Sequence, residues 1–503
     1  MNAPTDFDAF AQLYLRGEAQ VVSTTLIADL ETPVSAFLKI AGERPNSFLL
    51  ESVEGGETRG RYSMIGLEPD LIWRTQDGRA EINRSAATDP DAFTPCPEAP
   101  LDALRALLAD SAIALPEGAP PMAAGVFGYL GYDMVRQMER LGPAKPDPIG
   151  VPDALLIRPT IMVVFDAVKD ELTAITPVRP RPGVSAKAAL EAALDRLDGI
   201  VAALDRPMAH PAPEPFHGHV EALSNTTEAE FCAMVDRAKD YIRAGDVFQV
   251  VLSQRFESPF ALPPFALYRA LRRINPAPFL VYLNFPGFSV VCSSPEILVR
   301  VRGGRVTIRP IAGTRRRGAN PGEDEALAAE LLADPKERAE HLMLLDLGRN
   351  DAGRVSQIGS VAVTDSYFIE RYSQVMHIVS NVEGRLDPRF DALDALAAGF
   401  PAGTVSGAPK VRAMEIIDEL EKDKRGIYAG AIGYFGANGE MDTCIVLRTA
   451  VVKDGRMHVQ AGAGLVYDSV PASEHQECVN KAKALFRAGE EAVRFAARAT
   501  RSQ

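Results

Sequence analysis

The sequence has few cysteines, and they are dispersed. Five occur in 503 residues, and none belongs to a Cys-x-x-Cys pair. An odd number of scattered thiols favours neither a disulfide framework nor a thiolate zinc site, and it is typical of a reducing compartment. We therefore predict a cytoplasmic protein in which Cys96, Cys232, Cys292, Cys444 and Cys478 pack as small core residues.

Long apolar runs and an excess of positive charge are also missing. No stretch approaches the ~20 apolar residues of a membrane helix, and the N-terminus, MNAPTDFDAF, lacks the basic segment of a secretory signal. The net charge is −13 and no long basic run is present, so neither nucleic acid nor an anionic membrane is an expected partner. An anionic substrate would need a local cluster of Arg, Lys or metal ions.

The remaining composition is that of a large globular enzyme. Hydrophobic residues make up 47% and charged residues 24% of the chain, enough for a sizeable core. The proline-rich stretch Arg206–Phe216 (RPMAHPAPEPF) is typical of a linker, and we place a boundary there between regions 1–210 and 211–503. Two similar glycine-rich stretches, Gly125–Asp133 (GVFGYLGYD) and Gly430–Gly439 (GAIGYFGANG), indicate either two related halves or two similar strand turns.

The stretch Ala333–Asp351 (ADPKERAEHLMLLDLGRND) predicts a helix with two acidic residues on one face. Asp334 is the expected N-cap, and Pro335 occupies the favoured first position. Glu337 fits the third helical position that a capping box uses. Glu340 lies on the same face one turn later, and it has no such structural explanation.

A second acidic helix start is predicted in Gly462–Lys481 (GAGLVYDSVPASEHQECVNK). A Gly-Ala-Gly turn is expected first, then Ser473 as the N-cap, with Glu474, Glu477 and Lys481 on one helical face. Glutamate is favoured at any helix start by the helix dipole, so a solvated surface is the alternative. Two Glu-x-x-Glu pairs without matching His or Cys nevertheless favour a hard cation such as Mg²⁺ over zinc.

Several single polar residues stand in apolar stretches. His377 is expected within a strand, where a lone histidine is more often a core residue than a catalyst. Arg448 is expected within the apolar strand Met441–Val452, although arginine is rarely buried unpaired and its fork suits a carboxylate. Glu296 follows a proline at a strand junction. Each observation is weak alone, but together they suggest a pocket for a small dicarboxylate.

Two further stretches that could contribute to a functional site contain predicted glycine turns. Pro401–Lys410 (PAGTVSGAPK) leads into a predicted helix, Val411–Glu421, and could present backbone N–H groups to an anion. Its glycine spacing is not that of a phosphate-binding Walker loop, and a tight strand-to-helix turn is the alternative interpretation. In Arg309–Gly318 (RPIAGTRRRG), Gly313 and Thr314 follow a strand, and the three arginines are expected to form a solvated basic turn.

In their order along the chain, these stretches resemble the chorismate-utilising enzymes, and most closely the component I subunits of anthranilate synthase. The resemblance covers residues 47–482 and rests on the segments SFLLES, GDVFQVVLSQRF, INPAPF, SSPEIL, RPIAGT, AEHLMLLDLGRND, QVMHIVS, PAGTVSGAPK, GIYAGAIGYFG, IVLRTA and GAGLVYDSVPASEHQECVNKA. It implies one large α/β (α+β) fold with two packed central antiparallel sheets flanked by helices. Region 1–210 would carry a tryptophan feedback site, and region 211–503 would form the chorismate-binding catalytic part.

The resemblance also implies roles for individual residues. The expected ligands of Mg²⁺ are Glu340 and Glu477, with Glu337 and Glu474 in its outer coordination sphere. The residues expected to bind chorismate are Gly462, Ala463, Gly464 and Lys481 for the ring carboxylate, Tyr428 and Arg448 for the enolpyruvyl part, and Gly313 and Thr314 lining the site. The expected catalytic residues are Glu296, as general acid for departure of the 4-hydroxyl group, His377, linked to pyruvate elimination, and Thr404, which lines the site.

The implied reaction is the Mg²⁺-dependent amination of chorismate with ammonia and elimination of pyruvate to give anthranilate, the first step of tryptophan biosynthesis. Within the family, Gln249 occupies the position at which water-using isochorismate and salicylate synthases carry a lysine base. Ala312 stands where aminodeoxychorismate synthases often carry a lysine. Aminodeoxychorismate synthase component I and an inactive tryptophan-sensing subunit are the alternatives.

Feedback and assembly are implied by the same resemblance. Glu51 and Ser52, with Pro278, Phe279 and Leu280, resemble the tryptophan feedback site, although Phe279-Leu280 replaces the commoner tyrosine-methionine. Ordinary strand packing is the alternative for these residues. No GxCxG nucleophile elbow of a glutamine amidotransferase is visible in the sequence. Glutamine use would therefore require a separate amidotransferase subunit, in an expected heterotetramer of two of each.

Overall fold

Two long strands, β3 (Thr58–Gln76) and β7 (Ala154–Asp166), pair antiparallel and connect the two halves of the sheet structure. The computed structural model describes residues 6–54, 58–208, 222–372 and 375–499, so the predicted boundary at 210/211 lies outside the described residues. At 19 and 13 residues, the two strands are long enough to take part in two sheets. Their register shifts between Pro69 and Leu71. Before this shift β3 also pairs with β2, and after it β3 also pairs with β4.

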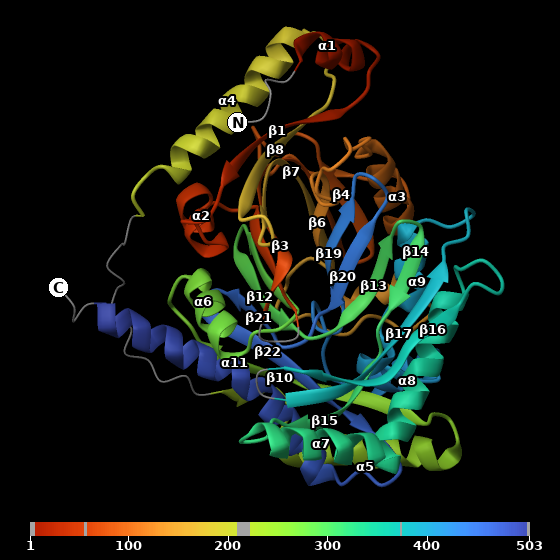
Figure 1. Ribbon diagram of the computed structural model, residues 1–503. Helices are drawn as coiled ribbons and strands as arrows, with labels where there is room; N and C mark the ends of the chain where they lie inside the picture. The colour runs from red at the N-terminus through yellow and green to blue at the C-terminus, as the bar shows by residue number, and fades with distance from the viewer. Residues whose placement is uncertain (1–5, 55–57, 209–221, 373–374, 500–503) are drawn as a thin grey trace.

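From this pair the ladder extends in two arms (Figure 1). The first arm runs from β3 through β2 (Ser47–Glu54), β11 (Phe279–Phe285), β12 (Phe288–Ser294), β21 (Thr449–Lys453) and β22 (Arg456–Leu465) to β10 (Gln249–Pro259). The second arm runs from β7 through β6 (Gly125–Leu130), β19 (Ala431–Gly436), β20 (Met441–Ile445), β13 (Ile297–Arg302) and β14 (Arg305–Ile308) to β17 (Val375–Arg385). Further strands flank these arms. Next to β7 lies β8 (Glu171–Val178), which pairs in turn with β1 (Gln20–Ile27). Next to β3 lies β4 (Arg79–Asn83), which pairs in turn with β5 (Thr94–Pro95). Two strands, β15 (Ile311–Arg316) and β16 (Ala362–Arg371), pair with β17, and two short ones, β9 (Leu223–Ser224) and β18 (Gly407–Ala408), pair with β10.

The two arms pack face to face around an apolar interior. Phe48 of β2 stacks on Phe127 of β6 with ring centroids 4.7 Å apart, and Phe127 stacks in turn on Tyr434 of β19. Cys292 of β12 and Cys444 of β20 are buried in the same layer. The prediction of two packed central antiparallel sheets is confirmed, and the structure adds that β3 and β7 join them.

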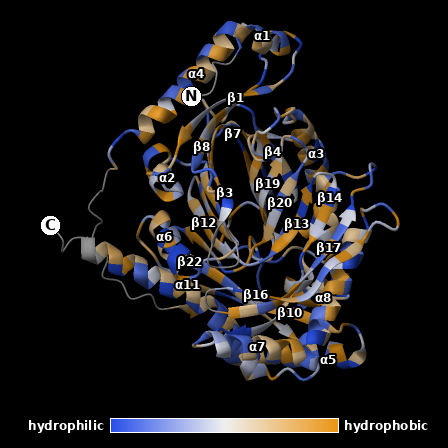
Figure 2. Cartoon of the chain, in the orientation of Figure 1, coloured by the Kyte–Doolittle hydropathy of each residue, from blue (hydrophilic) through white to orange (hydrophobic). Residues whose placement is uncertain are grey.

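Helices cover the outer face of each arm (Figure 1). Those that pack against the first arm are α1 (Phe7–Leu15), α2 (Pro33–Ile40), α4 (Ala186–Leu204), α6 (Pro264–Ile274) and α11 (Pro471–Ala499). Those that pack against the second arm or the β10 and β22 edge are α3 (Pro100–Asp110), α5 (Glu228–Ala244), α9 (Ala392–Gly399) and α10 (Lys410–Leu420). Figure 2 shows hydrophobic residues along the central strands and alternating character along α4, as expected of a helix with one face on the core. None of the described helices combines the length and the apolar character needed to cross a membrane.

Strands from both sides of the predicted boundary pair directly with one another. β2 pairs with β11, and β6 pairs with β19. The two similar glycine-rich stretches are therefore neighbouring strands, with Gly128 opposite Gly433, and not turns. A Cβ on either glycine would lie 2.0 Å from a backbone carbonyl oxygen of an adjacent strand, so both positions require glycine.

All five cysteines are free. Cys292, Cys444 and Cys478 are buried, as predicted. Cys96 and Cys232 are partly exposed, so the predicted core position is wrong for these two. Cys96 directly follows β5, and Cys232 lies in α5.

Candidate active site

Helix α8 (Pro335–Gly353) begins as the sequence predicts. The Asp334 side chain accepts hydrogen bonds from the backbone N–H groups of Lys336 and Glu337, and Pro335 is the first helical residue. This cap places Glu337 and Glu340 on one face of the first two turns. Helix α7 (Pro321–Ala333) precedes it, and both pack against β15 and β17.

Helix α11 begins earlier than predicted. Its first residue is Pro471, so Ser473 is an internal residue of the first turn and not the N-cap. The Ser473 N–H donates to the carbonyl oxygen of Val470 at 2.9 Å. A proline at the first helical position, with φ already helical, favours this start. Glu474, Glu477 and Lys481 nevertheless lie on one face, because their spacing is helical throughout.

The Gly462–Gly464 segment is part of strand β22 and not a turn. Gly462 pairs with Ser253, and Gly464 pairs with Val251, in the ladder to β10. The glycines leave space for neighbouring groups: a Cβ on Gly462 would lie 2.8 Å from the Tyr428 hydroxyl oxygen, and one on Gly464 2.8 Å from the side-chain nitrogen of Gln249. The segment therefore forms an uncrowded strand surface beside Tyr428.

The four predicted carboxylates come from two helix starts that meet at this strand surface. Glu340 Oε1 accepts a weak hydrogen bond from Gln249 Nε2 at 3.4 Å. Burial raises the pKa of Glu340, and the neighbouring carboxylates of Glu337 and Glu477 raise it further. Burial likewise raises the pKa of Glu474. This mutual repulsion shows that α8 and α11 bring negative charge together.

Each of the other site carboxylates has a basic partner. Glu477 Oε1 lies 2.7 Å from Lys481 Nζ, which also donates to the carbonyl oxygen of Gly462 at 2.9 Å. Glu337 Oε1 lies 3.1 Å from Arg315. In this arrangement no three His, Cys, Asp or Glu side chains of the described residues converge closely enough to hold a metal ion. Glu477 and Lys481 are exposed, so the site opens to solvent on the α11 side.

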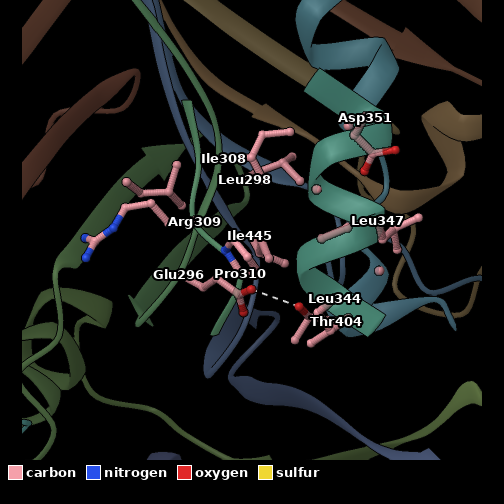
Figure 3. A pocket seen from close by; sticks show the side chains of 15 residues that line it. Glu296, Leu298, Ile308, Arg309, Pro310, Leu344, Leu347, Asp351, Thr404 and Ile445 are labelled. Atoms are coloured by element: carbon pink, nitrogen blue, oxygen red, sulfur yellow. Dashed lines mark hydrogen bonds between the residues drawn. The ribbon is translucent and has the colours of Figure 1, made fainter. Parts of the chain in front are cut away.

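Glu296 and Thr404 face each other at the edge of a small cavity of about 30 Å³ (Figure 3). Glu296 lies between β12 and β13, as predicted, and Thr404 lies in the short helix η2 (Gly403–Val405). Thr404 Oγ1 donates to Glu296 Oε1 at 2.8 Å. Burial raises the pKa of Glu296 to about 8, although the Thr404 bond and the Ile311 N–H lower it. Glu296 is therefore protonated at neutral pH and can donate a proton.

His377 lies in β17, as predicted, beside a bulge in β15. Its Nδ1 lies 2.9 Å from the Gly313 carbonyl oxygen and 3.1 Å from Thr314 Oγ1. Because a carbonyl only accepts, Nδ1 carries the proton in the neutral ring, and Nε2 holds the lone pair. Burial lowers the pKa of His377 to about 4, and the charges of Arg448 and Lys481 also oppose protonation. The ring is thus a neutral acceptor at physiological pH.

Arg448 lies in the break between β20 and β21, and not within a strand as predicted. Its backbone has φ of 48°, an uncommon left-handed conformation for a residue with a side chain. The side chain is half-buried, burial lowers its pKa, and no acidic partner is found for it among the described residues. A cation that loses part of its solvation without gaining a counter-ion is costly, so this position favours an anionic ligand.

The three arginines after Thr314 do not form a turn, because Arg315 and Arg316 belong to β15. Arg316 is exposed as predicted, but the prediction of a solvated side chain is wrong for Arg315 and Arg317, which are only partly exposed. Arg315 contacts Glu330, Asp334 and Glu337 at 2.8 to 3.1 Å. It thereby connects the strand that carries Gly313 to the start of α8. The sequence analysis did not predict a role for Arg315. The signal that could have indicated one is the position of three arginines close in sequence to two acidic helix starts.

The family model of chorismate binding enzymes matches residues 47–487. The chain belongs to the chorismate-binding enzymes. It is 58% identical over 499 residues to anthranilate synthase component 1 of Cereibacter sphaeroides, covering 98% of this chain and 99% of that protein. It is 48% identical over 466 residues to anthranilate synthase component 1 of Thermus thermophilus, covering 93% and 97%. The predicted family resemblance is confirmed.

This chorismate-binding enzyme also resembles solved structures. Anthranilate synthase component I from Streptococcus pneumoniae TIGR4 matches with a TM-score of 0.75 at 37% identity, covering 92% of this chain and 99% of that one. The menaquinone-specific isochorismate synthase of Escherichia coli matches with a TM-score of 0.70 at 19% identity, covering 96% and 100%. The second match shows the shared fold alone.

A separate cavity of about 330 Å³ lies between the two arms of this chorismate-binding enzyme, within the ~300–1,000 Å³ range of small-molecule sites. Ser52 and Phe279, predicted for tryptophan, line it together. Glu51 also contributes to the lining, but its carboxylate is bonded to Arg272 of α6. Leu280, the ladder partner of Glu51, points to the face opposite Phe279. Pro278 directly precedes β11. The residues predicted to bind tryptophan are therefore not all in the cavity: some of their side chains point toward α6 instead.

Proposed function

We propose that this protein is the chorismate-aminating subunit of anthranilate synthase, a lyase that forms anthranilate and pyruvate from chorismate and ammonia. The names of its relatives support this assignment over nearly the full length of the chain. The observation that carries it structurally is the half-buried Arg448, which has no acidic partner among the described residues, together with the buried acid Glu296. Both interact electrostatically with Tyr372, so they lie on the same side of the molecule. Such a site attracts an anionic substrate and can protonate a leaving group.

Chorismate carries two carboxylates, and the site offers two cationic positions. The planar fork of Arg448 suits one carboxylate in bidentate geometry, on the enolpyruvyl side next to Tyr428. Lys481 and the uncrowded strand Gly462–Gly464 suit the ring carboxylate, because the lysine already reaches the Gly462 carbonyl oxygen. Placing opposite ends of the substrate at separate cations orients the ring toward Glu296.

The residues of the two helix starts fit a magnesium ion. Burial and the charges of Glu337 and Glu477 raise the pKa of Glu340, and a hard cation with oxygen ligands would relieve that repulsion. Glu340 and Glu477 would hold it, with Glu337 and Glu474 in its outer coordination sphere. When bound, Mg²⁺ supplies positive charge that neutralises a substrate carboxylate and orients the ring.

Proton transfers are assigned to Glu296 and His377. Glu296 is protonated at neutral pH and would donate its proton to the departing 4-hydroxyl group as ammonia attacks C2, while Thr404 holds Oε1 in place. The neutral His377 ring, oriented through Nδ1 by Gly313, leaves Nε2 free of a proton. It is placed to accept a proton when pyruvate leaves and the ring becomes aromatic.

The chemistry at two further positions supports this function over its neighbours in the family. Gln249 contacts Glu340 and is not a base, which disfavours activation of water. Ala312 lies in β15 where an aminodeoxychorismate synthase often carries lysine. The acid and carboxylate positions Glu296, Glu340 and Glu477 are all present, which argues against an inactive sensor.

Partners and feedback are part of the same proposal. The word component in the relatives' names supports a second, glutamine-hydrolysing subunit that supplies ammonia, in a heterotetramer. The cavity at Ser52 and Phe279 would bind tryptophan as a feedback inhibitor. Its Arg61, Arg300 and Arg302 suit the carboxylate of an amino acid.

The purified protein should be incubated with chorismate and an ammonium salt, with and without Mg²⁺, and the products identified by fluorescence and mass. Anthranilate and pyruvate in equal amounts, formed only with Mg²⁺, are expected. A 4-amino product would instead identify aminodeoxychorismate synthase. Absence of both pyruvate and an aromatic amine would refute the proposal.

A further inference from the structure

Directly after α10, a buried ion pair joins Glu421 and Arg425. The side chains are only 6% and 1% exposed, and Arg425 donates to both carboxylate oxygens, at 2.9 and 2.6 Å. Neither residue belongs to the predicted site. A buried pair of this kind often adds little to stability, because desolvation offsets the attraction, so its contacts indicate what else it does.

The Arg425 guanidinium reaches three separate segments. Nη1 donates to the Val405 carbonyl oxygen at 2.7 Å, next to Thr404, and Nη2 donates to the Val251 carbonyl oxygen at 2.7 Å. Val251 is the ladder partner of Gly464. The guanidinium carbon also lies 5.6 Å from the centroid of the Tyr428 ring, within cation–π range. One rigid cation thus contacts the backbone or rings on three sides of the site.

Glu421 extends the connection to a fourth position. Its Oε1 accepts from the Ser253 backbone N–H at 2.7 Å and from the Ser253 hydroxyl at 2.9 Å. Ser253 is the ladder partner of Gly462. The pair therefore contacts the strand opposite both glycines that adjoin the predicted carboxylate position.

We propose that Glu421 and Arg425 are positioning residues that hold the Thr404 segment at a set distance from the Gly462–Gly464 strand and Tyr428. This inference rests on the proposed reaction, because Thr404 contacts the general acid and the strand faces the substrate. The planar fork of arginine reaches Val405, Val251 and Glu421 at once, whereas a lysine ammonium is a single point on a flexible stem. Charge alone therefore cannot replace it.

The test compares R425K, E421Q and the double variant R425M/E421M with the wild type. The double variant removes both charges, so it leaves no buried ion uncompensated. It should still fold, with a lower melting temperature because the Val405 and Val251 carbonyls and the Ser253 N–H lose their partners. We expect kcat/KM for chorismate to fall about 100-fold, the loss expected for a displacement on the order of 1 Å. R425K should not restore it. The alkaline limb of kcat should also move to higher pH, because a loosened Thr404 no longer lowers the pKa of Glu296.

The matched control is K424M. Lys424 is the neighbouring residue; it is also buried, and it pairs with Asp153 at 3.1 Å. This variant should lose melting temperature but keep the wild-type alkaline limb. The inference is overturned if R425M/E421M folds with wild-type kcat, KM and pH profile, or if K424M reproduces its profile. If the wild type forms no anthranilate, the proposed function fails, and chorismate affinity by calorimetry then tests the inference: an unchanged Kd in the double variant would overturn it.

Discussion

The buried Glu51 carboxylate and the partly exposed Arg272 guanidinium form a bidentate ion pair between β2 and α6, at 2.6 and 2.9 Å. Tyr268, also in α6, donates a third hydrogen bond to the same carboxylate at 2.5 Å. Helix α6 shares its apolar core with α11, the helix that carries Glu477 and Lys481. The ion pair thus connects the wall of the inter-sheet cavity to α6, and α6 packs against the helix of the candidate active site.

Removing the Glu51–Arg272 ion pair should weaken inhibition by tryptophan without reducing the uninhibited activity. In R272M, tryptophan inhibition is expected to weaken at least ~5-fold, the lower end of ordinary allosteric coupling, while kcat without tryptophan stays near the wild-type value. Inhibition curves at fixed chorismate measure the effect. R273M is the matched control, since Arg273 packs over the Phe495 ring on the other side. A wild-type inhibition curve for R272M would contradict this route.

Filling the cavity should abolish inhibition directly. Ser52 and Phe279 line the cavity as ladder partners, so S52F places a second ring in the space that tryptophan would occupy. We expect loss of inhibition and of tryptophan binding by calorimetry, with kcat unchanged. L280M should retain both, because Leu280 points to the opposite face. If S52F left the inhibition curve unmoved, the tryptophan assignment would fail.

Ionisation of Glu296 should cause the decrease of kcat at alkaline pH, which is the alkaline limb of the pH–rate profile. The residue must carry its proton, so kcat should fall as pH rises through about 8, where burial places its pKa. In T404V the limb should move to higher pH, because the lost hydrogen bond lowers that pKa in the wild type. E296Q should lose ~10²- to 10⁴-fold in kcat. Steady-state rates of the wild type, T404V and E296Q from pH 6 to 10 test these expectations. An alkaline limb that does not shift in T404V would count against Glu296 as the general acid.

The carboxylates at the starts of α8 and α11 should destabilise the metal-free protein and bind Mg²⁺. Because burial and like charges raise the pKa of Glu340, its folded charged form is disfavoured at neutral pH. E340Q should therefore raise the melting temperature in the absence of metal while abolishing Mg²⁺-dependent turnover. E477Q should also abolish turnover, and E474Q should reduce it less. Mg²⁺ titration by calorimetry provides the second readout; E340Q with wild-type Mg²⁺ affinity would refute its role.

Arg448 should behave as a destabilising residue kept for substrate. Its half-buried charge has no acidic partner among the described residues, so R448M is expected to raise the melting temperature. The same change should raise KM for chorismate and lower kcat. R448K keeps the charge but not the fork, and we expect ~10-fold or greater loss in kcat/KM, on the order of one bidentate contact. Thermal unfolding with and without chorismate separates these effects, and a lower melting temperature for R448M would contradict the interpretation.

Local chemistry made much of the molecule predictable. Asp334 and Pro335 specify the start of α8 through atoms within four residues, and the i, i+3, i+7 spacing of α11 keeps three polar side chains on one face. The glutamate pairs, the strand junction at Glu296 and the strand at His377 were likewise visible in the order of residue types. Ordered motifs along the chain were enough to indicate the family and the two-sheet fold.

The features that the sequence did not predict depend on contacts between segments that are distant in the chain. Gly462–Gly464 looks like a turn in isolation, but pairing with β10, about two hundred residues earlier, makes it a strand. Arg448 occupies a strand break and Arg315 an ion-pair cluster because of neighbours that no local window contains. Phe279 and Leu280 differ by one residue, yet the period of two in a strand sends them to opposite faces. Burial sets the protonation of Glu296, and burial exists only once the chain has folded.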